Sequence, residues 1–186
     1  MPQMEITTTL VVKARADWRQ WLADNHATAQ EIWLLFPARD SGKPGIPYVE
    51  AVEEALCFGW IDGIAKRMDD EYRAQRFTPR RPNGNWTELN KERARRMMAS
   101  GLMTEAGLAK LPDLSLDAFR IAEDILTALQ ADAQTWQNFQ NFPPLYQRVR
   151  IRFIEDSRGQ PAEFQKRLDK FLHKTQQNQR FGGRLE

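Results

Sequence analysis

The chain has 186 residues and a mass of 21.7 kDa, and 41% of its residues are hydrophobic while 28% are charged. This length and apolar content suffice to bury a substantial core, which excludes a wholly disordered chain. The formal net charge is only +2, which argues against a protein dominated by nucleic-acid binding.

Several functional classes receive no support from the composition. No segment approaches the roughly 18 to 20 consecutive apolar residues of a membrane helix, and the first residues lack a secretion-signal pattern. We therefore expect no membrane insertion and a cytoplasmic location. The single cysteine, Cys57, cannot form an internal disulfide, and the two histidines, His26 and His173, are far apart in sequence. We expect neither a metal site nor a cofactor.

The charge is distributed unevenly along the chain. Residues 1–62 contain five basic and nine acidic residues, a net charge of −4. Residues 73–96 contain eight basic and two acidic residues, a net charge of +6. This second segment is therefore a candidate anion-binding surface.

The first third of the chain predicts a strand, a helix and a second strand. Residues 10–12 are apolar and strand-like, and Trp18, Trp21 and Leu22 recur at helical spacing in a segment that extends to His26. The apolar run at residues 32–36 is short and is followed by Pro37, which favours a buried strand.

A helix and a hairpin follow. Pro47 suits the first turn of a helix, and Gly59 supplies a natural terminator. Residues 60–66 and 72–78 then flank a short polar turn, as the two strands of a hairpin do. Pro79 and Pro82 end the second strand.

A helix with one apolar and one strongly basic face follows the hairpin. Asn85 and Glu88 have the spacing of a capping box at its start, and Gly101 marks its end. Beyond Pro112 the apolar residues recur with helical periods, and residues 143–144 and 159–161 separate these segments. The helical segments are residues 119–129, 136–142, 149–154 and 164–172.

These elements predict an α+β fold with three parts. Residues 1–111 form an N-terminal lobe with a small antiparallel sheet and helices, and residues 112–176 form an all-helical C-terminal lobe. Residues 177–186 form a flexible tail. We expect a cleft between the lobes, and the oligomeric state is left open.

Several short runs identify a family resemblance. The sequence Ala-Leu-Cys-Phe-Gly-Trp-Ile-Asp at residues 55–62, Phe-Thr-Pro-Arg at residues 77–80, Trp86, Asn90 and Gly-Leu-Met at residues 101–103 resemble the YdeI/OmpD-associated family, often labelled bacteriocin-protection proteins. The helical region from about residue 120 to 173 also resembles that family's C-terminal domain. The resemblance implies a bacterial cytoplasmic protein that confers tolerance to envelope-directed toxins and whose chemistry is undefined.

Residues 55–90 concentrate aromatic, acidic and basic side chains, so we predict that they form the functional surface. Trp60 and Asp62 are two residues apart on a strand and project to the same face. If the hairpin brings Arg73 or Arg80 close, Asp62 is ionised and accepts hydrogen bonds from a ligand or from the arginine. A purely structural pair of Asp and Arg is the equally weighted alternative.

The proline-flanked segment 77–82 holds Arg80 and Arg81 on a stiff, extended chain suited to phosphate or carboxylate recognition. Trp86 can stack on a planar ligand, and Asn90 offers both a donor and an acceptor. Alternatively, Trp86 packs on the core and Asn90 caps a chain end. The predicted ligand-binding set is Trp60, Asp62, Arg80, Trp86 and Asn90.

The leading hypothesis is a stress-tolerance protein that binds a small planar or anionic ligand and has little or no catalytic activity. One alternative is a nucleic-acid-binding module, because a basic segment with an interleaved tryptophan can contact phosphates and bases. A second alternative is an enzyme with Asp62 as general acid or base. Cys57 is a poor nucleophile candidate, because it lies near a helix C-terminus among apolar residues. The nucleic-acid contacts would be Arg73, Arg76, Arg81, Arg93 and Arg96.

Overall fold

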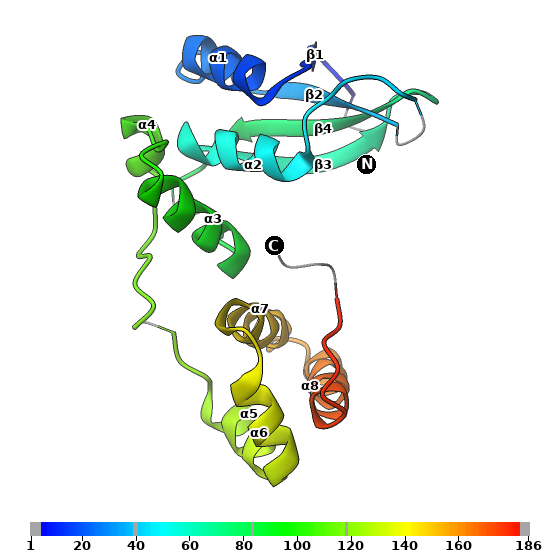
Figure 1. Cartoon of the computed structure of the whole chain (residues 1–186), viewed down its shortest axis with the longest axis vertical. Coiled ribbons are helices and arrows are strands. Elements are labelled where there is room, and N and C mark those ends of the chain that lie inside the picture. The colour runs from blue at the N-terminus through cyan, green and yellow to red at the C-terminus, as the bar shows by residue number, and fades with distance from the viewer. Residues whose placement is uncertain (1–4, 39–40, 83, 118, 183–186) are drawn as a thin grey trace. The chain divides into compact units, whose positions relative to one another are not determined.

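The computed structural model describes residues 5–38, 41–82, 84–117 and 119–182. They form two compact units, and each is described by itself. The first consists of the chain up to Asn85 together with Arg93–Pro112, and the second of Trp86–Glu92 and the chain from Asp113 onward. The first contains a sheet with helices, and the second is helical, which confirms the predicted α+β class (Figure 1).

The sheet of the first unit has the strand order β1-β2-β4-β3. Strands β2, β4 and β3 pair in antiparallel fashion, as predicted, whereas β1 runs parallel to β2, so the sheet is mixed. Strand β1 can pair parallel to β2 because α1 connects them as a crossover and returns the chain in its original direction. The elements of this unit are β1 (Thr9–Val11), α1 (Arg15–Asn25), β2 (Ile32–Pro37), α2 (Tyr48–Cys57), β3 (Trp60–Arg67), β4 (Tyr72–Pro79), the second half of α3 (Glu88–Ala99) and α4 (Glu105–Leu108).

Strands β3 and β4 form the predicted hairpin. Asp69 closes its turn, because its Oδ1 accepts hydrogen bonds from the backbone N–H groups of Glu71 and Tyr72, at 2.8 and 2.7 Å. The register shifts between Asp62 and Ala65. Gln75 lies opposite this irregularity, and its Nε2 donates to the carbonyl of Gly63 at 2.8 Å.

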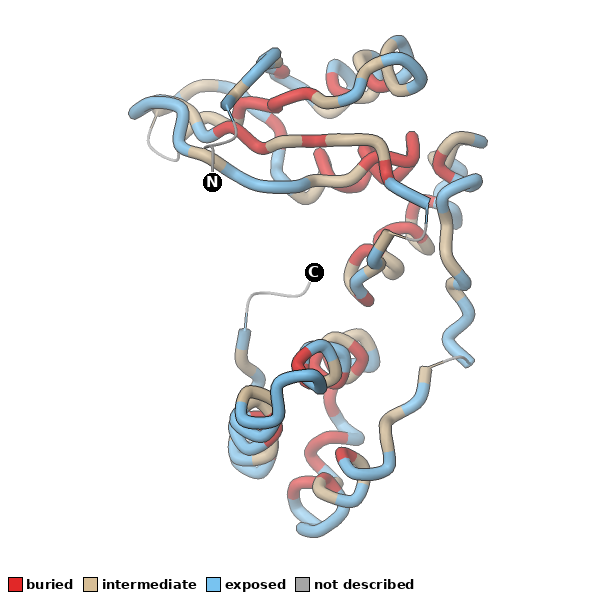
Figure 2. The backbone as a smooth tube through the Cα atoms, turned by 180° about the vertical axis from the view of Figure 1, so that it is seen from behind, coloured by how far each residue is buried: buried red, intermediate tan, exposed pale blue. Residues whose placement is uncertain are grey.

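Tryptophans dominate the core of the first unit, and Figure 2 shows the buried stretches of its strands and helices. Trp18 of α1 is fully buried, and its ring centroid lies 5.3 Å from that of Phe77 on β4. Its indole Nε1 donates to the carbonyl of Ala51 at 3.0 Å, which ties α1 to α2. A buried indole N–H usually finds an acceptor of this kind, so Trp18 also helps to determine how α1 and α2 align.

The end of α2 and the start of α4 make a close backbone contact. The carbonyl of Cys57 accepts from the backbone N–H and from Oγ1 of Thr104, at 3.1 and 2.6 Å. Gly107 follows within α4, and a Cβ at this position would lie 2.2 Å from the same carbonyl oxygen. Gly59 ends α2 with φ of +72°, as the sequence predicts for a terminating glycine.

The start of α3 differs from the predicted capping box. The helix begins at Glu88, and the backbone N–H of Asn90 donates to Oγ1 of Thr87 at 3.1 Å. Thr87 therefore provides the cap in place of Asn85. Ser, Thr, Asp and Asn all suit this role, so composition alone does not choose between the two positions.

The second unit has one apolar core formed by its helices. Within this unit, Arg148 of α7 holds the start of α3, because its guanidinium pairs with Glu92 at 2.8 Å and with Glu88 at 3.5 Å. The breaks predicted at residues 143–144 and 159–161 separate the helices as expected. The helices are α5 (Glu123–Gln130), α6 (Ala133–Asn141), α7 (Pro144–Glu155) and α8 (Pro161–Gln176). Their core contains Ile125, Leu129, Phe139, Phe142, Tyr146, Ile151, Ile154, Leu168 and Phe171.

Replacing Gly107 with alanine is expected to lower the free energy of unfolding by about 3 kcal/mol, because the added methyl group meets backbone atoms that cannot rotate away. Urea denaturation followed by tryptophan fluorescence measures this change. The matched control is Gly63→Ala, where the nearest atom to the new Cβ is 3.7 Å away. Equal stability of the two variants would contradict the assigned contact.

Candidate functional site

Trp60 lies in the core of the first unit. It is 1% exposed, its Nε1 donates to the carbonyl of His26 at 3.1 Å, and its ring meets Trp21 edge-on at a centroid distance of 5.7 Å. Both its polar atom and its ring therefore have partners inside the protein. Its ring is not presented to solvent, so the geometry favours a structural role for this residue.

Asp62 and Arg80 influence each other electrostatically. Burial lowers the pKa of Arg80 to about 10, and the negative charge of Asp62 partly opposes this shift. Arg80 is 5% exposed, and its Nη1 donates to the carbonyl of Asn85 at 3.3 Å. Asp62 itself accepts a hydrogen bond from the hydroxyl of Tyr48. The charge of Asp62 therefore acts on Arg80, one of the two arginines considered as its partner.

Trp86 and Asn90 belong to the second unit. Trp86 is partly exposed, whereas Asn90 is buried in the first turn of α3. The first unit contains the other three members of the predicted set, so the five residues are not gathered within one unit. A ligand-binding role for Trp86 and Asn90 stays a prediction.

The predicted basic contact set is partly neutralised by carboxylates. Arg76 pairs with Glu31 at 2.5 Å, Arg96 pairs with Glu53 at 3.1 Å, and Arg93 is only 6% exposed. These three guanidinium groups are less accessible to nucleic-acid phosphates than the sequence suggests. The other two members are exposed, namely Arg73 and Arg81.

A network of buried ion pairs lies along α2. Glu54 has a 2% exposed side chain and pairs with Arg15 at 2.5 Å and with Arg19 at 2.6 Å, while Glu53 pairs with Arg15 at 3.0 Å and with Arg96. Desolvation lowers the pKa of Arg15, but the hydrogen bond and charge of Glu54 outweigh it, so the net shift is upward. These charges satisfy one another and stabilise the packing of the helices.

Cys57 is fully buried at the end of α2. Burial and the nearby charge of Glu54 raise the pKa of its thiol to about 11, although Arg19 opposes this effect. The thiol is therefore protonated at neutral pH, which is the opposite of what a nucleophile requires.

The described residues form neither a metal-binding cluster nor a membrane-spanning helix. They contain no group of three or more His, Cys, Asp or Glu side chains arranged to hold a metal ion. Among the helices that they form, none combines the length and apolar character needed to cross a membrane.

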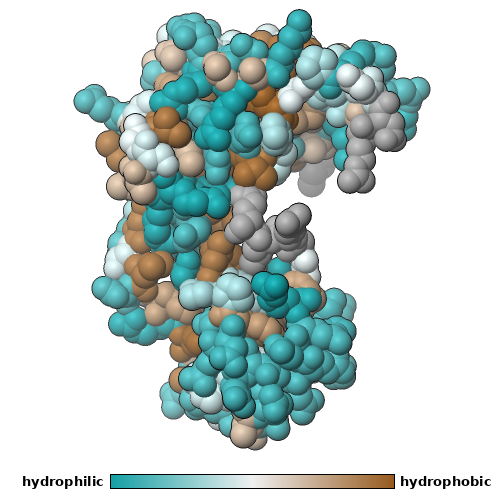
Figure 3. Space-filling view, in the orientation of Figure 1, coloured by the Kyte–Doolittle hydropathy of each residue, from teal (hydrophilic) through white to brown (hydrophobic). Residues whose placement is uncertain are grey.

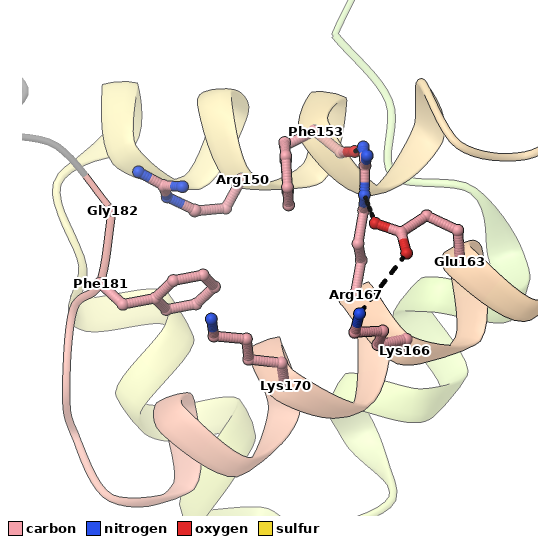
Figure 4. Close-up of a pocket in the computed structure, with 8 residues that line it drawn as sticks. All are labelled: Arg150, Phe153, Glu163, Lys166, Arg167, Lys170, Phe181 and Gly182. Carbon is pink, nitrogen blue, oxygen red and sulfur yellow. Dashed lines mark hydrogen bonds and ion pairs between the residues drawn. The ribbon is translucent and has the colours of Figure 1, made fainter.

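The second unit contains a pocket of about 500 Å³ (Figure 4). Arg150 and Phe153 of α7 form one side, and the segment after α8 contributes Phe181 and Gly182. The lining residues of α8 recur at spacings of three or four, which places them on one helix face. Hydrophilic side chains gather over α8 in Figure 3. The lining residues from α8 are Glu163, Lys166, Arg167 and Lys170.

One part of the pocket has its positive charge balanced by a carboxylate. Arg167 donates from Nε to Glu163 at 2.8 Å, and Lys166 lies 3.9 Å from the same carboxylate. The hydrogen bond from Arg167 is the main reason that the pKa of Glu163 is below its usual value. The guanidinium of Arg167 also lies 4.0 Å from the centre of the Phe153 ring and donates from Nη1 to the Phe153 carbonyl at 2.7 Å.

In the other part of the pocket, two cations lie close to an aromatic ring instead of a carboxylate. The guanidinium carbon of Arg150 lies 5.0 Å from the centre of the Phe181 ring, and Nζ of Lys170 lies 5.3 Å from it. Arg150 is 8% exposed, and its Nε makes no hydrogen bond among the described residues. Figure 4 shows Arg150, Phe153 and Lys170 around one open space, with the Phe181 ring beside it.

Two family models match the chain. Residues 10–110 match one described as "Domain of unknown function (DUF8412)", and residues 118–178 match one described as "Bacteriocin-protection, YdeI or OmpD-Associated". The first match covers more than half of the chain, so the chain belongs to the DUF8412 family, whereas the second match shows a similarity confined to the helical region. No curated protein and no solved structure gave a significant match.

These matches confirm the family resemblance and locate it. The match to the YdeI/OmpD-associated model spans α5 to α8 and hence every pocket residue from Arg150 to Lys170, whereas Phe181 and Gly182 lie a few residues beyond its end. The runs at residues 55–62 and 77–80 fall instead within the DUF8412 match.

The pocket was not predicted from the sequence. The sequence pattern that could have indicated it is the recurrence of charged residues from Glu163 to Lys170 along one face of a predicted helix. Such a stripe is usually a solvated surface, and the residues opposite it come from another helix and from the chain end. Only the folded arrangement distinguishes a pocket from a charged helix face.

Cys57 is expected to resist alkylation in the folded protein. Raising a thiol pKa lowers the thiolate fraction about tenfold per unit, so iodoacetamide at about pH 8 should react roughly a hundredfold more slowly than with the denatured chain. Mass spectrometry of the alkylated protein measures both rates. Comparable rates in the folded and denatured states would contradict the assigned environment.

Proposed function

We propose that the YdeI/OmpD-associated domain binds a small anionic ligand in the α7/α8 pocket, and that this binding serves a protective role of the bacteriocin-protection type. The family description supports the protective role. The charge and geometry of the pocket support the ligand class. The proposal retains the anionic ligand predicted from sequence and assigns it to the helical unit.

The observation that carries this proposal is the cation–π contact of Arg150 and Lys170 with the Phe181 ring. A ring face attracts a cation through its quadrupole but leaves the positive charge in place. A carboxylate would neutralise that charge, as Glu163 does for Arg167. No described carboxylate pairs with Arg150 or Lys170, and we propose that an anionic ligand supplies the negative charge for both.

The size and composition of the pocket agree with a small-molecule ligand. Its volume of about 500 Å³ lies within the range of small-molecule sites, roughly 300 to 1,000 Å³. Its lining contains four cationic side chains and one carboxylate, so it attracts negative charge. Phe153, which is 41% exposed, adds apolar surface for a non-polar part of the ligand.

The other two hypotheses find less support in the geometry. A nucleic-acid surface on residues 73–96 would need Arg76 and Arg96 to leave their carboxylate partners, which reduces the gain from phosphate contacts. An enzyme that uses Asp62 would require a substrate to displace the Tyr48 hydroxyl. We therefore place the ligand of this protein in the helical unit.

Substituting glutamine for Arg150 or Lys170 is expected to weaken binding of phenyl phosphate by about tenfold or more, because each change removes a charged donor. Isothermal titration calorimetry at constant ionic strength measures the affinities. The matched control is Arg152→Gln on the same helix, since Arg152 is half exposed and pairs with Asp156 outside the pocket lining.

Two outcomes would overturn the proposal. One is that the Arg152 variant loses as much affinity as the Arg150 variant, which would indicate a general charge effect. The other is that phenyl phosphate, inorganic phosphate and benzoate all fail to bind the unaltered protein. The protective role is tested separately, by comparing toxin tolerance of host cells that express the Arg150→Gln and Arg152→Gln variants.

A further inference from the structure

We infer that Phe181 is a positioning residue for a ligand with two negative charges, and that segment 177–182 and this ligand strengthen each other's binding. This inference rests on the proposed function and concerns the same pocket. It assigns a role to a segment that lies mostly beyond the family match, which ends at residue 178.

The chain reverses direction after α8 in a defined motif. Asn178 has φ of +53°, the backbone N–H of Asn178 donates to the Thr175 carbonyl, and that of Gln179 donates to the Lys174 carbonyl. This pair of bonds around a left-handed residue is the Schellman arrangement, which asparagine tolerates well. The motif directs the following residues back toward α7.

The reversed segment is attached to α7 and α8 at three places. The backbone N–H of Phe181 donates to the hydroxyl of Tyr146 at 3.2 Å, and its ring lies 6.4 Å from that of Phe171. Gly182 approaches the Arg150 guanidinium so closely that a Cβ would lie 2.2 to 2.5 Å from its atoms. Segment 177–182 is thus docked as a strap along one side of the pocket, although the sequence predicts a flexible tail there. Residues 183–186 of that tail lie outside the described residues.

The docked ring lies close to two like charges, one on α7 and one on α8. Arg150 and Lys170 both lie within 5.3 Å of the ring centre. Their mutual repulsion opposes docking of the strap, while the ring quadrupole favours it. A ligand with two negative charges removes the repulsion, whereas a single charge removes only part of it. Strap docking and dianion binding are therefore linked, and the linkage is reciprocal.

The first experiment distinguishes the effect of the Phe181 ring quadrupole from the effect of its apolar volume. Phe181→Leu keeps an apolar side chain against Phe171 but loses the quadrupole, and it is expected to weaken phenyl phosphate binding about tenfold at about pH 8. Phe181→Trp keeps a ring and is expected to bind within about twofold of the unaltered protein. Benzoate, a monoanion with the same ring as phenyl phosphate, should lose much less affinity in the Leu variant.

The second experiment measures the strap directly. Arg180 is exposed and precedes Phe181, so trypsin can cleave the bond between them once the strap opens. Saturating phenyl phosphate is expected to slow this cleavage about tenfold, and Arg150→Gln should abolish the protection. Mass spectrometry identifies the product that ends at Arg180, and cleavage after the exposed Lys13 serves as an internal reference for trypsin activity.

The outcomes distinguish this inference from the proposed function. If phenyl phosphate binds the Phe181→Leu variant as tightly as the unaltered protein, or leaves the cleavage rate unchanged, the strap inference is wrong while the anion pocket stands. Equal losses for benzoate and phenyl phosphate would overturn the preference for two charges. Failure of all anions to bind the unaltered protein would overturn both.

Discussion

Two buried carboxylates on α2, those of Glu53 and Glu54, determine how the helices of the first unit are arranged. A carboxylate removed from water must be paired, and leaving one unpaired costs about 3 to 5 kcal/mol. Arg15 and Arg19 of α1 meet this requirement at 2.5 to 3.0 Å, and Arg96 of α3 pairs with Glu53. These ion pairs constrain how α1 and the end of α3 are oriented against α2.

Positively charged side chains have different partners in the two units. We assign a structural role to those of the first unit and a ligand-binding role to those of the second. In the first unit the arginines beside α2 are neutralised by carboxylates, so they hold helices together and attract little else. In the pocket of the second unit, Phe181 supports Arg150 and Lys170 without cancelling their charge. Glu163 neutralises only the Arg167 side. A ring in place of a carboxylate is the basis of the anion site that we propose here.

Several features of the fold could be predicted from local patterns. The strand at Ile32–Pro37, the hairpin of β3 and β4 and the helical second half all followed from apolar periodicity and turn residues. The dense run at residues 55–62 was more ambiguous. Its residues from Ala55 to Phe58, and Trp60, are buried, because α2 and β3 pack inside the first unit. Aromatic density therefore marked a core at these positions, since periodicity cannot distinguish a buried face from a binding face.

The sequence by itself determined the elements, the α+β class and the family, because these depend on residues that are neighbours along the chain or on the family's own pattern. Only the tertiary structure decided the parallel pairing of β1, the ion pairs of Arg76 and Arg96, and the α7/α8 pocket. The pocket joins Arg150, Lys170 and Phe181, which belong to α7, α8 and the strap. Contacts between such distant residues depend on how helices pack and on where the chain reverses. Neither is encoded in the spacing of any single segment.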